Sequence, residues 1–135
     1  MSDPEQRRVV SVNVGLPKTV QWGDQTVTTG IFKSPVDGPV ALREHNLDGD
    51  RQADLSVHGE PTKAVYVYSA QHYTYWRQEL PDVELGWGHF GENFTVDGMD
   101  EQSINIGDEF TVGTARVVVT EPRMPCFKLS IRFGR

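Results

Sequence analysis

The chain has 135 residues, enough for one domain with a single hydrophobic core. Its formal net charge of -6 argues against a broad surface for a nucleic-acid polymer. No stretch has the apolar length that crosses a bilayer, the first residues contain no apolar signal segment, and one cysteine excludes an internal disulfide framework. These features predict a cytoplasmic protein that binds neither nucleic-acid polymers nor membranes.

Short strands are predicted in the first part of the chain. Valines alternate with other residues over 8–14, and this period of two predicts a strand. The runs 19–22 and 25–28 are rich in residues that favour strands, and only the dipeptide Gly-Asp at 23–24 separates them. Such a two-residue link is typical of a β-hairpin.

A turn is expected over 35–39, followed by a short strand over 40–43. The next segment, 45–54, is polar and carries three aspartates, which superficially suggests calcium. However, its glycine falls directly between Asp48 and Asp50, and no glutamate closes the loop at the required offset. The segment does not match an EF-hand, so we do not expect a metal there.

A buried strand is predicted over 64–68 from its β-branched and aromatic residues. Ser69 then suits the N-cap of a helix that runs to about Leu80, where a following proline ends it. Tyr73, Trp76 and Leu80 are three and four residues apart and share one face of this helix. That face is expected to pack in the core, in preference to binding a cofactor.

The remainder of the chain predicts further strands. One is expected over 93–96, and apolar residues alternate with polar ones over 104–112. A tight link at 113–114 leads into an apolar, β-branched run at 117–120, which is typical of a buried strand. Many short strands and a single predicted helix indicate a mainly β fold, namely a mostly antiparallel β-barrel with one helical insertion.

Cys126 is the most chemically distinctive residue, in the motif E-P-R-M-P-C-F-K at 121–128. Arg123 and Lys128 flank it, and nearby cations stabilise the thiolate, which is the reactive and metal-binding form of cysteine. Two prolines stiffen the loop. Cys126 is therefore a candidate metal ligand or nucleophile, and a small buried hydrophobe is the alternative. The basic residues around it predict a pocket for a small anion or a solvated basic face.

Other segments offer groups that could converge on Cys126. His58 and Lys63 provide a titratable ring and a cation. Gly91 and Asn93 provide a backbone that a ligand can approach and an amide that both donates and accepts hydrogen bonds. A pair formed by the cysteine and a histidine stays open as a nucleophilic site. Zinc is not expected, because the four histidines are scattered along the chain.

Four motifs occur in a fixed order: H-G-x-P-x-K-A-V-Y-x-Y at 58–68, F-G-E-N-F-T-V-D-G at 90–98, I-G-D at 106–108 and P-R-M-P-C-F-K-L at 122–129. In this order they resemble the MOSC domain, which is named after the C-terminal domain of molybdenum cofactor sulfurases. The resemblance is strongest to the stand-alone bacterial branch of YiiM-like proteins. It extends over most of the chain, from about residue 15 to residue 129.

The resemblance implies a β-rich barrel that binds the pterin-based molybdenum cofactor. Cys126 would ligate molybdenum or carry sulfur, and soft sulfur suits such a site. The resemblance implies that Asn93 and Arg123 lie near the cofactor, with Lys63 in the same pocket. Lys128, as a cation, and Gly91, as a glycine that lets the backbone approach a ligand, complete the expected cofactor-binding residues. His58 would lie in the same pocket and would act as the catalytic proton donor. Related proteins reduce N-hydroxylated compounds, including hydroxylaminopurine-type base analogues and amidoximes, so the implied partners are such a substrate and an electron-donating reductase.

The sequence departs from the family pattern in two places. Glu60 makes the usual H-G-G an H-G-E, and the chain stops at Arg135, where stand-alone relatives generally continue with a helical segment. We therefore expect a single MOSC domain over 1–135 without that segment. Two alternatives to a reductase stay open: a non-redox module that carries the cofactor or sulfur on Cys126, and a β-barrel interaction domain with a structural cysteine.

Overall fold

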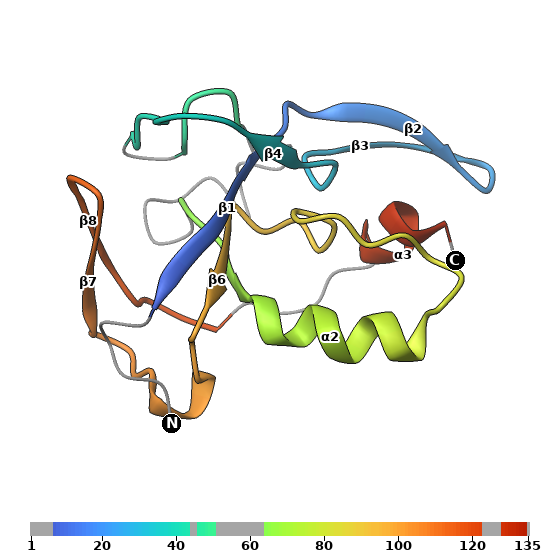
Figure 1. Cartoon of the computed structure of the whole chain (residues 1–135). Coiled ribbons are helices and arrows are strands. Elements are labelled where there is room, and N and C mark those ends of the chain that lie inside the picture. The colour runs from blue at the N-terminus through green and yellow to red at the C-terminus, as the bar shows by residue number, and fades with distance from the viewer. Residues whose placement is uncertain (1–6, 44–45, 51–63, 123–127, 135) are drawn as a thin grey trace.

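The computed structural model describes residues 7–43, 46–50, 64–122 and 128–134. Its centre is a four-stranded sheet in the order β4, β1, β6, β5 (Figure 1). The four strands are β4 (Ser34–Val36), β1 (Arg8–Val14), β6 (Phe94–Asp97) and β5 (Val67–Ser69). β1 pairs antiparallel with β4 and β6, whereas β5 pairs parallel with β6. The sheet therefore joins segments far apart in the sequence.

Two hairpins stand apart from this sheet. The first joins β2 (Lys18–Trp22) to β3 (Gln25–Thr29), as the Gly-Asp link predicts, and it projects away from the central sheet in Figure 1. The second joins β7 (Glu109–Val112) to β8 (Ala115–Val118) through the predicted tight link. Each forms a two-stranded sheet of its own.

The barrel prediction was wrong for the part of the chain that the structure describes. A barrel closes when its two edge strands pair, but β4 and β5 end the sheet on opposite sides and do not pair. Each edge strand is only three residues long, and β4 contains Pro35, which has no N–H to donate to a neighbour. Strand-like alternation in a sequence shows that strands exist, but it does not show how their edges join.

The predicted helix is α2 (Ala70–Glu79), with Ser69 as its N-cap and Leu80 as its C-cap. The Ser69 hydroxyl accepts a hydrogen bond of 3.3 Å from the backbone N–H of Gln71, which satisfies one of the free donors of the first turn. Two short helical elements were not predicted: the 3₁₀-helix η3 (Glu101–Ser103) and α3 (Lys128–Phe133). No helix of the described residues is long and apolar enough to span a membrane.

The hydrophobic core lies between α2, the segment after it, and α3. Tyr73, Leu85 and Phe90 are its buried centre. The half-buried side chains around them are Tyr68, Trp76, Val83, Trp87, Leu129 and Phe133. This arrangement confirms that the aromatic face of α2 belongs to the core.

Several expected strands differ from the structure, and of the expected run 104–112 only β7 (Glu109–Val112) is a strand. In segment 40–43 the structure has only an isolated bridge, between Leu42 and Leu47, so the prediction of a strand there was wrong. β5 begins at Val67, later than expected. The run 117–120 does not form a buried strand: β8 ends at Val118, whose side chain is 52% exposed. A hairpin without a third strand or a helix over its outer face leaves alternate side chains in water.

Candidate functional site

The buried face of β1 is its polar face. Ser11 and Asn13 are buried, whereas the alternating valines are only half-buried. The Asn13 side-chain amide donates to the backbone carbonyl of Glu92 at 3.2 Å and to the hydroxyl of Thr95 at 3.0 Å. Ser11 in turn donates to the side-chain oxygen of Asn13 at 2.6 Å. β1 therefore presents an amide to the centre of the molecule, where its valines were the more obvious core residues.

Every residue from Gly88 to Thr95 is buried, and we call this stretch the central turn. Glu92 has no exposed surface, and three hydrogen bonds reach its carboxylate. The hydroxyl of Tyr73 donates at 2.5 Å, that of Thr95 at 2.8 Å, and the backbone N–H of Phe90 at 3.2 Å. A buried carboxylate with this many donors is held in one position and links α2 to the central turn.

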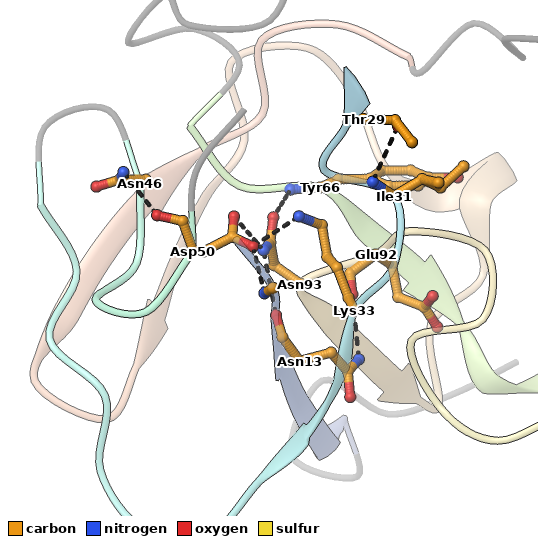
Figure 2. A network of polar contacts seen from close by, with 10 residues as sticks. Asn13, Thr29, Ile31, Lys33, Asn46, Asp50, Tyr66, Glu92 and Asn93 are labelled. Carbon is orange, nitrogen blue, oxygen red and sulfur yellow. Dashed lines mark hydrogen bonds and ion pairs between the residues drawn. The ribbon is translucent and has the colours of Figure 1, made fainter. Parts of the chain in front are cut away.

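Asp50 is the focus of a second buried network, drawn in Figure 2. Its carboxylate is 2.6 Å from the ammonium of Lys33, and both side chains are buried. It also accepts from the N–H of Gly15 at 2.9 Å and from the side-chain amide of Asn93 at 3.0 Å. In the segment whose aspartates superficially suggested calcium, Asp50 therefore has a lysine as its cation.

Asn93 lies where the two networks meet. Its side-chain oxygen accepts from the backbone N–H of Tyr66 at 3.0 Å, and its amide nitrogen donates to Asp50 and to the Asn13 carbonyl, the latter at 3.2 Å. The Asn93 backbone N–H also donates to the Tyr66 carbonyl at 2.8 Å. These bonds fix the chain at Tyr66, three residues after Lys63. The implied contact of Asn93 with a cofactor stays a prediction.

Gly91 adopts a φ of +83°, a region that side chains rarely occupy. A Cβ added there would lie 2.9 Å from Cγ1 of Ile31. The glycine thus lets the central turn pack against the segment after β3, where Figure 2 labels Ile31. Its predicted role, close approach to a ligand, is not tested by this contact.

The other side of the central turn contacts α3, which starts at Lys128, two residues after Cys126. The ring of Phe133 lies 4.6 Å from that of His89 and 5.3 Å from that of Phe90, measured between centroids. Lys128 is half-buried at the first position of α3. The central turn therefore supports the helix that begins at the last residue of the cysteine motif.

His89 is buried, and its surroundings lower its pKa. Burial, and then the nearby charge of Arg132, lower the pKa of His89 to about 4, so the ring is neutral at neutral pH. Burial also lowers the pKa of Arg132.

Four predicted site residues lie outside the described residues: Cys126, Arg123, His58 and Lys63. The predicted residues that are described, Asn93, Gly91 and Lys128, occupy the central turn and the start of α3. The elements that border the two undescribed motif segments, at Tyr66 and at α3, both contact the central turn.

Sequence reasoning missed five buried polar residues of the described part of the chain: Asn13, Lys33, Asp50, Tyr73 as a hydrogen-bond donor, and Glu92. The available signal was weak. Asn13 lies in a strand otherwise marked by its valines, and Glu92 lies inside F-G-E-N, where only the glycine and the asparagine drew attention.

Comparison with known proteins places this geometry in a family. The model of the MOSC domain matches residues 54–135. The uncharacterized protein YflK of Bacillus subtilis is 45% identical over 130 residues, covering 96% of this chain and 58% of that protein. Protein YiiM of Escherichia coli is 43% identical over 107 residues, covering 78% of this chain and 48% of that protein. A protein named reductase from Gibberella moniliformis is 36% identical over 133 residues, covering 96% of this chain and 23% of that protein.

Solved structures agree with these relatives. The crystal structure of YiiM from Geobacillus stearothermophilus matches with a TM-score of 0.71 at 36% identity, covering 93% of this chain and 56% of that chain. YiiM from Escherichia coli matches with a TM-score of 0.63 at 36% identity, covering 76% and 48% of the two chains. The chain spans about half the length of the two bacterial relatives. It belongs to the MOSC domain family.

Proposed function

We propose that this chain binds the molybdenum cofactor and takes part in the reduction of N-hydroxylated compounds, such as hydroxylaminopurine-type base analogues and amidoximes. The observation that carries the proposal is the family match over 54–135, which includes Cys126, its flanking cations and the His58 motif. The relative named reductase supports an oxidoreductase in preference to a binding module.

The described residues fit such a site as its supporting frame. Lys128 is a half-buried cation at the start of α3, which suits an anionic group of the cofactor. Asn93 holds the chain at Tyr66, and Gly91 lets the central turn pack closely. These contacts support a role for Asn93 and Gly91 in positioning the neighbouring motif segments, because the side-chain amide of Asn93 already has protein partners.

When bound, a molybdenum cofactor supplies the two-electron chemistry that such a reduction requires. The substrate oxygen leaves as water, so two protons must be delivered along with the electrons of a partner reductase. We assign Cys126 to the metal, because a thiolate flanked by Arg123 and Lys128 is a soft, stabilised ligand. His58 is assigned to proton delivery, and Arg123 and Lys63 to anion binding.

The test is reduction of benzamidoxime to benzamidine by the protein from a host that makes the cofactor, with a reduced viologen dye as electron donor. Wild type should form the amidine, and Cys126→Ala should lose almost all turnover. The same protein from a host that cannot make the cofactor serves as the control. Equal turnover in all three preparations would overturn the proposal.

The carrier function is the second candidate, and the same preparations separate it from the reductase. A carrier would show no turnover with wild type but would hold sulfur on Cys126, seen as a mass increase of one sulfur atom that a thiol reductant removes. If the wild type shows no turnover and holds no added sulfur, the interaction domain is the remaining interpretation.

A further inference from the structure

Two buried nitrogens near α3 have no hydrogen-bond partner among the described residues: Nε2 of His89 and Nε of Arg132. Buried polar atoms in folded proteins are almost always hydrogen-bonded, and an exception points to a further partner such as a water or an ion. The two nitrogens come from different elements, the central turn and α3. These two elements are in contact through His89 and Phe133, and each carries a nitrogen without a partner.

The two side chains belong to elements that are in contact. The ring of His89 lies 4.6 Å from that of Phe133, which follows Arg132 in the chain, and Arg132 is close enough for its charge to act on the His89 ring. His89 is 9% exposed, so its Nε2 has little access to bulk water. The guanidinium carbon of Arg132 lies 5.4 Å from the centroid of the Phe32 ring, so an aromatic side chain also borders this place.

Arg132 also lacks a close counter-ion in the described part of the chain. None of the described ion pairs includes Arg132. Glu92 is near enough to act on the Arg132 charge, yet its carboxylate already accepts from Tyr73, Thr95 and Phe90. Burial disfavours an unpaired guanidinium, so a negatively charged ligand would offset the positive charge of Arg132.

We propose that His89 and Arg132 together bind one small oxyanion, a carboxylate or a phosphate, whose oxygens accept from Nε2–H of His89 and Nε–H of Arg132. An arginine Nε always donates, and the neutral His89 imidazole also donates from Nε2 in the tautomer that carries its proton there, so one acceptor serves both groups. An oxyanion meets both needs and adds the missing charge. The site does not rest on the molybdenum cofactor.

The primary test is a titration of the wild-type chain with sodium formate and, separately, inorganic phosphate, at constant ionic strength set with sodium chloride. The ring nitrogen resonances of His89 are followed by two-dimensional NMR. We expect a saturable shift at Nε2, and the anion that saturates at lower concentration identifies the class of ligand. A His89 resonance that does not shift with either anion would overturn the proposal.

Variants provide the second readout. His89→Phe keeps an aromatic ring beside Phe133, and Arg132→Gln removes the guanidinium; each should weaken anion binding by about tenfold or more, the usual effect of losing a hydrogen bond to a charged group. Arg116→Gln is the matched control, since it removes the same charge from an exposed side chain on β8 and should keep the wild-type affinity. Equal affinity in all variants would contradict the assignment. If a variant fails to fold, the wild-type titration decides alone.

Discussion

The hydroxyl of Tyr73 donates a hydrogen bond of 2.5 Å to the carboxylate of Glu92, and neither residue has exposed surface. The same hydroxyl accepts from the backbone N–H of His89 at 3.2 Å. Burial and the charge of Glu92 raise the pKa of Tyr73, so the hydroxyl keeps its proton at neutral pH. One side chain on α2 therefore joins two points of the central turn.

Replacing Tyr73 by phenylalanine should destabilise the protein by about 1.5–3 kcal/mol, because the buried carboxylate of Glu92 loses a donor. Urea unfolding of the variant and the wild type measures the difference. Tyr75→Phe is the control on the same helix: Tyr75 is 53% exposed, so its change should stay within about 0.5 kcal/mol. Similar losses for both variants would show that the Glu92 contact does not stabilise the fold.

The ion pair of Lys33 and Asp50 is buried, and removing the lysine leaves a buried carboxylate without its cation. Lys33→Met should therefore lower the free energy of unfolding by about 3–5 kcal/mol. The pair of Arg43 and Asp48 has similar chemistry but is exposed, so Arg43→Met should cause no measurable change. Thermal and urea unfolding of both variants give the comparison, and a tolerant Lys33 site would contradict it.

His89 should make stability depend on pH. Its pKa is about 4 in the folded protein and 6.5 as an ordinary histidine, so the unfolded chain binds more protons between these values. The contribution of His89 to the free energy of unfolding is fully present above pH 6.5. It is lost as the pH falls toward 4, by at most about 1.4 kcal/mol per pH unit. Measurements use amine buffers with chloride as the counter-ion, so that no oxyanion is present.

The contribution of His89 is the difference between the pH profiles of wild type and His89→Phe, because carboxylates titrate in both proteins. The variant should lose less stability between pH 6.5 and 4. A His89→Phe profile parallel to that of the wild type would show that His89 titrates normally in the folded state.

Gly91→Ala should destabilise the protein by about 1–3 kcal/mol, because the new Cβ meets Ile31 at 2.9 Å in a backbone region that alanine avoids. Gly113→Ala separates the two causes. Gly113 also has a positive φ, +60°, but nothing lies within 4 Å of an added Cβ. Gly113→Ala should therefore lose less stability than Gly91→Ala. Equal losses of stability would mean that the contact with Ile31 adds nothing to the cost of the positive φ.

Local features were predictable from the sequence. The β2–β3 hairpin follows from a two-residue link between strand-forming runs, and α2 follows from Ser69 and the spacing of Tyr73 and Trp76, because in each case the decisive residues are neighbours in the chain. α3 was not predicted because its six residues, which begin at the last residue of the cysteine motif, are too few to show a helical period.

The sheet order and the buried networks depend on contacts distant in the sequence. Lys33 and Asp50 are 17 residues apart, and Asn13 and Thr95 are 82 apart, so nothing local identifies either pair. Alternation along β1 predicts two faces but cannot show that the face with Asn13 is the more buried one. The motifs identified Asn93 and Gly91 as candidates, whereas only the structure reveals what holds them.

The central claim, that this chain is a cofactor protein built around Cys126, is tested most directly by elemental analysis for molybdenum together with pterin fluorescence after oxidation. The protein is purified from a cofactor-competent host, with wild type and Cys126→Ala in parallel. We predict near-stoichiometric metal and pterin in the wild type, and reduced or lost metal in the variant. Wild-type protein without molybdenum and without pterin would contradict the claim.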